Sequence, residues 1–167
     1  MRVEMQIATI TLDPDSKTPI LVLKSIIGDR TLPIWVGLPE AASIISALQD
    51  VTFERPMTHD LFCTFIDQVK KELTRIEVCD LKGNTFYARI FFKDENTEFS
   101  LDARPSDAIA LAVRLKARIY AAEHVLNMSE TEVKTPEGEI EDDSEEGKKW
   151  AEYLAGLSPD DFGKYKV

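Results

Sequence analysis

The stretch DARPSDAIALAVR at residues 102–114 changes from an extended pattern into an amphipathic helix within a few residues. Pro105 suits the first position of a helix, because the N–H group that proline lacks has no partner inside the helix there. Asp107 falls in the first turn, where the helix dipole favours a carboxylate, and apolar residues follow it. The stretch therefore predicts a helix over 105–116 that is entered from a strand at about 97–103.

The stretch RPMTHDL at residues 55–61 repeats these ingredients, with an arginine, a proline and an aspartate ahead of an apolar run. Thr58 is a good N-cap for a second helix, whose apolar residues follow the 3.6-residue period as far as Leu73. A further helix is predicted from Pro39 to about Asp50. Because charged residues collect at helix N-termini in both Arg-Pro segments, we expect the two segments to meet in space and form one site.

Alternation of apolar and polar residues predicts the strands of the fold. They lie at residues 2–12, 19–26, 30–36, 75–81, 85–93, 97–103 and 118–121. Short turn-forming clusters separate several of these strands and favour hairpins. The sequence thus predicts an α+β fold, a curved and mostly antiparallel sheet with three main helices, in a domain of residues 1–128.

The chain has 167 residues and a net charge of −10, which is unevenly distributed. Residues 129–167 hold 12 Asp and Glu against 5 Lys and Arg, and this composition predicts an acidic linker followed by a short helical segment, with Ser144 as a cap. No apolar run approaches the roughly 20 residues that span a bilayer, so we expect no membrane association and a cytoplasmic location. The charge balance also argues against strong, sequence-independent binding to nucleic acid, although a local arginine cluster can still bind phosphate.

The two Arg-Pro segments resemble the signature runs of the bifunctional nuclease domain family. LPIWVG at residues 32–37 followed by Glu40-Ala41, and Phe86-Tyr87-Ala88, are similar to further parts of the same pattern. The resemblance covers about residues 1–128. It implies an α+β domain that commonly self-associates, so a homo-oligomer is expected, with a dimer favoured. It also implies nuclease activity towards RNA and DNA, which is attributed to some members of the family.

Hydrolysis of a phosphodiester needs an activated water, compensation of charge on the transition state and a proton for the leaving oxygen. Carboxylates that hold a divalent metal commonly supply the first two. With Glu40 as a further carboxylate, the candidates are His59, Asp60, Asp102 and Asp107 for catalysis, and Arg55, Arg104, Arg114 and Ser106 for substrate binding. We expect Mg or Mn near Asp60, Asp102 and Asp107, with His59 as acid or base. No organic cofactor is expected, because no glycine-rich loop suited to phosphate is present.

A structural role competes with each of these assignments. A carboxylate in the first turn of a helix is stabilised by about 0.3–1 kcal/mol without any function, and Asp102 and Arg104 are spaced to pair on one face of a strand. Ser106 suits a capping role, and His59 suits a capping or surface role. Two functions therefore stay open: a metal-assisted nuclease acting on RNA and/or DNA, and a non-enzymatic binding or scaffold module. In the second, the Arg and Asp residues form a salt-bridge network at helix N-termini or at a subunit interface.

Overall fold

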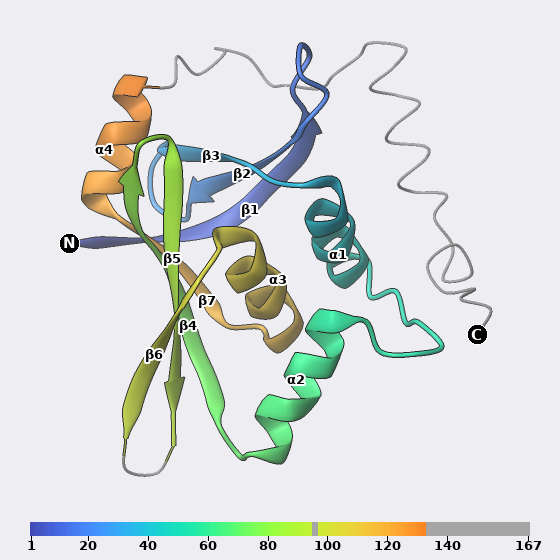
Figure 1. Cartoon of the computed structure of the whole chain (residues 1–167). Helices are drawn as coiled ribbons and strands as arrows, with labels where there is room; N and C mark the ends of the chain where they lie inside the picture. Colours follow the sequence, from blue (N-terminus) through green and yellow to red (C-terminus); the bar gives the residue numbers. More distant parts are fainter. Residues whose placement is uncertain (95–96, 133–167) are drawn as a thin grey trace.

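One seven-stranded open sheet runs through the computed structural model, which describes residues 1–94 and 97–132 (Figure 1). Its strands are β1 (Arg2–Leu12), β2 (Pro19–Ser25), β3 (Thr31–Trp35), β4 (Glu72–Lys82), β5 (Thr85–Lys93), β6 (Glu98–Ala103) and β7 (Arg118–Ala122). They lie in the order β3-β2-β1-β7-β4-β5-β6. The β4–β7 pair is parallel, whereas the other neighbours are antiparallel. Strand β7 therefore joins two antiparallel halves of the sheet.

The helices in this part of the chain are α1 (Leu38–Leu48), α2 (Thr58–Gln68), α3 (Pro105–Leu115) and α4 (Glu123–Glu132). Helix α3 is the most deeply buried of them, since every residue from Ala108 to Ala112 is buried. It packs on β4, β5 and β7, while α1 and α2 pack against α3 (Figure 1). None of the helices within the described residues has the length and apolar character needed to cross a membrane. The packing places the N-terminal residues of three helices within reach of one another.

The predicted α+β class and the mostly antiparallel sheet are confirmed, and β5 has the predicted bounds. Helix α4 was not predicted. Its Val125 and Leu126 are fully buried, and Ser129 is buried as well, so the predicted boundary after residue 128 falls inside this helix. The sequence signal is weak because only a few apolar residues interrupt an otherwise polar segment. Residues 129–132 of the predicted acidic linker belong to α4, whereas the rest of the linker and the helix predicted to start at Ser144 lie outside the described residues.

Helix α2 ends at Gln68, so the prediction that it continues to Leu73 is wrong. Lys70 adopts a left-handed backbone conformation with φ of 53°, and the N–H of Lys71 donates to the carbonyl oxygen of Ile66 at 3.1 Å. This bond satisfies a carbonyl that the end of a helix leaves without a partner. Leu73 instead belongs to β4, where it is buried.

Helices α1 and α3 end in the same way. Asp50 after α1 has φ of 53° and Lys116 after α3 has φ of 54°. The N–H groups of Val51 and Ala117 then donate to carbonyls five residues earlier, those of Ser46 and Ala112, at 2.9 Å each. Glycine is the usual residue for this conformation, so none of these three helix ends carries its ordinary sequence signal.

Replacing Lys70 with glycine is expected to stabilise the protein by about 0.5–1 kcal/mol, because a β-carbon is disfavoured in the left-handed conformation. Lys70 is exposed, so no burial is lost. The matched control is Gln68→Gly, two residues earlier and still inside α2, which should destabilise by a similar amount. Urea unfolding of both variants measures the effect. Destabilisation by both glycines would contradict the left-handed conformation of Lys70.

Candidate active site

One imidazole connects helices α1, α2 and α3. His59, in the first turn of α2, has its Nε2 atom 3.1 Å from Oδ1 of Asp107 in α3. Its Nδ1 atom lies 2.8 Å from Oγ of Ser43 in α1. The expectation that the two Arg-Pro segments meet in space is thereby confirmed.

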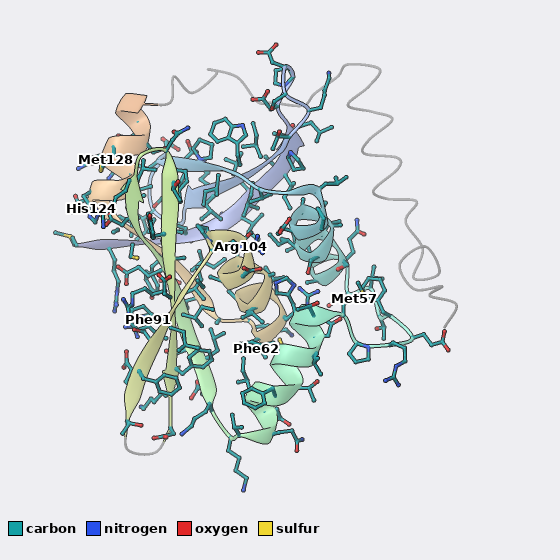
Figure 2. The ribbon with its side chains drawn as sticks, in the orientation of Figure 1. Met57, Phe62, Phe91, Arg104, His124 and Met128 are labelled. Atoms are coloured by element: carbon teal, nitrogen blue, oxygen red, sulfur yellow. The ribbon has the colours of Figure 1, made fainter. Side chains whose placement is uncertain are left out.

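Asp107 is also held by the arginine that precedes α3. Arg104 donates from Nε to Oδ2 of Asp107 at 2.7 Å and from Nη2 to Oδ1 at 3.0 Å. Its Nη1 donates to Oε1 of Glu40 in α1 at 2.9 Å. The Arg104 side chain is 64% exposed and stands at the start of α3 (Figure 2). Because a guanidinium carries more N–H groups than these three bonds use, Arg104 retains donors for a ligand.

The pKa values of this pair favour the charged forms. Burial raises the pKa of Asp107, whereas the contacts with Arg104 and His59 lower it, and the net direction is downward. The hydrogen bond with Asp107 is the main cause that raises the pKa of Arg104. An ionised carboxylate only accepts hydrogen bonds, so Nε2 of His59 carries a hydrogen. In the neutral ring Nδ1 then accepts the hydroxyl hydrogen of Ser43 and is the atom that can take up a proton.

Arg114 positions Ser43. Its Nη1 donates to the carbonyl oxygens of Ser43 and Ala110 at 3.1 and 3.0 Å, and its Nη2 donates to Oγ of Ser43 at 3.2 Å. Its Nε donates to Oδ1 of Asp60 at 2.6 Å. The Arg114 side chain is only 10% exposed. These contacts fit an arginine that holds the Ser43 hydroxyl against His59 better than one that binds a phosphate.

Local backbone features fix two of the carboxylates. The second oxygen of Asp60 accepts the N–H of Met57 at 3.0 Å, and Met57 is the N-cap of α2, whereas Thr58 was predicted in that place. Gly37 is the N-cap of α1. A β-carbon on Gly37 would lie 2.2 Å from Oε2 of Glu40, so only glycine leaves room for Glu40 in its position beside Arg104.

These side chains line a cavity of about 310 Å³, which we call the site cavity. Its polar wall comes from the cluster just described, and its apolar wall comes from the start of α1 and from the loop before α2. Besides Glu40, Ser43, His59, Arg104, Asp107 and Arg114, it is lined by Pro39, Ala42, Ser46, Phe53, Met57 and Thr58. A bound group can therefore contact Arg104 and the Ser43–His59 pair at the same time.

The other predicted residues lie apart from this cluster. Arg55 is exposed on the loop before α2, and Asp102 is exposed on β6. The predicted pairing of Asp102 with Arg104 is replaced by the bonds from Arg104 to Glu40 and Asp107. Ser106 is buried in the first turn of α3 and lines a second cavity.

The expected metal ligands do not assemble into one centre. Asp60 pairs with Arg114 and Asp107 with Arg104, while Asp102 stands on the sheet. Across residues 1–94 and 97–132, no group of three or more His, Cys, Asp and Glu side chains is arranged to hold a metal ion. The residues as placed thus do not fit the expected Mg or Mn site.

Ser43 is the member of this cluster that the sequence did not predict. It follows Glu40 by three residues, so the two side chains share one face of α1. The sequence signal for Ser43 was its position, since its hydroxyl lies one helical turn beyond the candidate carboxylate of Glu40. Helix spacing could have raised Ser43 as a candidate, although its partner His59 could not be inferred from spacing.

Comparison with known proteins places the chain in a family. Residues 21–134 match the model of the bifunctional nuclease domain, and the chain belongs to that family. It is 38% identical to an uncharacterized protein of Mycobacterium tuberculosis, over 95% of this chain and 97% of that protein. It is also 30% identical to bifunctional nuclease 2 of Oryza sativa subsp. japonica and 28% identical to bifunctional nuclease 1 of Arabidopsis thaliana. These alignments cover 60% and 64% of this chain but 32% and 34% of the plant proteins.

Changing Asp107 to asparagine should lower the free energy of unfolding by about 1 kcal/mol at neutral pH, a value reduced by the exposure of Arg104. A lowered folded-state pKa means that the ionised carboxylate stabilises the fold above pH 3.8. This contribution disappears as the pH falls through the folded-state value. Urea unfolding of both proteins across this range should therefore show a difference that shrinks below pH 3.8.

The control for this pH series is Asp67→Asn, at an exposed aspartate near the end of α2. It should change the stability by less than about 0.5 kcal/mol. A difference between wild type and Asp107→Asn that stays constant down to acid pH would show that the ionised carboxylate is not what stabilises the cluster.

Proposed function

We propose that this protein is a nuclease that hydrolyses phosphodiester bonds of RNA and/or DNA in the site cavity. The observation that carries the proposal is the hydrogen-bonded series Ser43–His59–Asp107, which lies beside Arg104 on one cavity wall. Membership of a family with plant members named bifunctional nucleases supports the same reaction.

His59 acts as the proton acceptor. As a water attacks phosphorus, it gives a proton to Oγ of Ser43, and Ser43 passes its own hydroxyl proton to Nδ1 of His59. Asp107 accepts from Nε2 and stabilises the imidazolium that forms. In an in-line displacement the leaving oxygen departs on the opposite side of phosphorus, so it takes its proton from solvent. His59 then returns its extra proton to solvent.

Arg104 binds the phosphate. Its exposed guanidinium stands at the rim of the site cavity, keeps its charge and retains N–H donors. Such donors stabilise the charge that develops on the phosphoryl oxygens, and the effect is strongest where water is excluded. Glu40 and Asp107 fix the plane of the guanidinium, so little reorganisation is needed when the phosphate binds.

The second candidate is a non-enzymatic binding or scaffold module. The observation that favours it is the pairing of Arg104 with Glu40 and Asp107 and of Arg114 with Asp60, which ties α1, α2 and α3 together. Networks of this kind hold helices in place without any chemistry. The two candidates differ in what a substitution changes, because the scaffold role affects stability and the nuclease role affects turnover.

Replacing His59 with alanine should reduce phosphodiester hydrolysis by roughly 10²–10⁴-fold, which is the usual contribution of a positioned acid or base. The matched control is His124→Ala, which removes the other of the two histidines. His124 is 58% exposed and pairs with Asp80 away from the site cavity, so its loss should leave turnover unchanged. Turnover on single-stranded RNA and DNA and the thermal midpoint are measured on the same preparations.

The same measurements of turnover and thermal midpoint distinguish the nuclease from the scaffold role. Asp107→Asn should lower turnover in parallel with His59→Ala. Unchanged turnover per folded molecule together with a lowered thermal midpoint in both variants would establish the scaffold role. A contaminating nuclease is excluded by showing that activity co-elutes with the wild-type protein and falls in His59→Ala purified in the same way.

A requirement for Mg or Mn stays a prediction from the sequence. It is tested by assaying wild-type protein with EDTA and then with either ion restored. Loss of activity that the ion restores would confirm the requirement, and full activity in EDTA would contradict it. Circular dichroism in EDTA is the control, because it shows whether the chelator alters the fold.

A further inference from the structure

A second cavity of about 320 Å³ lies beside the Glu40–Arg104 ion pair. We call it the aromatic cavity, because its lining includes Trp35 and Phe86. Glu40 and Arg104 line both cavities, so one ion pair forms their common wall. A ligand bound to Arg104 can therefore extend into either cavity.

The indole ring of Trp35 is held in place although it is 42% exposed. Its Nε1 donates to Oδ2 of Asp13 in the turn between β1 and β2 at 3.3 Å. The other oxygen of Asp13 accepts the backbone N–H groups of Asp15 and Ser16 at 3.1 and 2.7 Å, which fixes the carboxylate as well. A ring that is already oriented loses little conformational freedom when a ligand packs on it.

The rest of the lining adds small polar groups to these aromatic faces. Asn84 and Thr85 come from the β4–β5 hairpin, and Ser106 comes from the first turn of α3. An amide and two hydroxyls can each donate and accept hydrogen bonds. Glu40, whose charge is balanced by Arg104, contributes the acidic group of this lining.

This lining suits a nucleotide. It combines flat apolar faces with hydrogen-bond donors and acceptors, and a guanidinium lies beside them. Bases stack on aromatic rings and hydrogen-bond through their edges, while the phosphate binds arginine. A base inside a duplex cannot enter such a cavity without leaving its stack. The volume also falls near the lower end of the roughly 300–1,000 Å³ of small-molecule sites, which suits a single base.

We propose that the aromatic cavity binds one nucleobase of a single-stranded nucleic acid while Arg104 binds the adjacent phosphate. This inference rests on the proposed nuclease function and names its substrate class, a single strand with an unstacked base next to the cleaved linkage. The site cavity then receives the phosphate, and the aromatic cavity fixes its position along the strand.

Binding is measured on the full chain carrying His59→Ala, so that the strand stays intact. The probe is a fluorescently labelled oligodeoxythymidylate at fixed salt, and a strand of equal length made of abasic spacers is the comparison. Trp35→Ala should weaken binding of the oligodeoxythymidylate by roughly 5- to 150-fold, the range for loss of one base–aromatic stack. Binding of the abasic strand should stay unchanged, and Trp35→Phe should restore most of the affinity for the oligodeoxythymidylate.

The control variant is Tyr87→Ala, which removes an aromatic side chain that is 39% exposed on β5 and absent from the cavity lining. It should leave both affinities unchanged. Trp150→Phe leaves Trp35 as the remaining tryptophan of the chain, so its emission reports directly on the cavity. The oligodeoxythymidylate should quench this emission, whereas the abasic strand and inorganic phosphate should not.

Equal affinity of the His59→Ala chain with and without Trp35→Ala for the oligodeoxythymidylate would overturn the inference. Absence of binding, or equal quenching by the abasic strand, would overturn it as well. These results are distinguishable from failure of the nuclease proposal. Base-dependent quenching of Trp35 in a protein that hydrolyses no strand would support the aromatic cavity and contradict the nuclease. Hydrolysis that depends on His59 but not on Trp35 would do the reverse.

Discussion

The carboxylate of Asp107 is the contact on which the site depends. It accepts hydrogen bonds from Arg104 and His59, so it links α3 to α2 and, through Arg104 and Glu40, to α1. Its partial burial opposes ionisation, whereas Arg104 and His59 favour it, and the net effect lowers the pKa of Asp107. Without this carboxylate the imidazole loses its hydrogen bond at Nε2, and Arg104 keeps only one of its two anionic partners.

The same pairing limits how the protein can attract a polyanion. Arg104 and Arg114 face three carboxylates, those of Glu40, Asp60 and Asp107, within a chain of net charge −10. The site thus offers directed N–H donors at one point and no broad positive surface. Proteins that neutralise many phosphates lose affinity steeply with salt. In the proposed mode of binding, one guanidinium binds one phosphate, so affinity would depend much less on salt, and packing of other parts of the strand would have to supply the rest.

Local sequence patterns were enough for the strands, for the starts of α1 and α3, and for the meeting of His59 with Asp107. They failed where a residue adopts a backbone conformation that its type usually avoids. Lysine and aspartate occupy left-handed positions after three helices, so the end of α2 carried no glycine signal. The position of Asp102, exposed on β6 and apart from the cluster, could not be predicted because its distance along the chain from Asp107 says nothing about which way the strand faces. Ser43 was missed because its role depends on packing between helices.

Strand β7 joins the two antiparallel halves of the sheet, and it is the last strand along the described part of the chain. Until residues 118–122 emerge, β1 and β4 each present an open edge, and such edges pair readily with other strands. Closing the sheet also brings the N-terminal strand beside a segment more than a hundred residues later, Arg2 opposite Ala122. Contacts of this separation form slowly. The two halves of the sheet can therefore join only after β7 has been synthesised, which makes completion of the sheet a late step of synthesis.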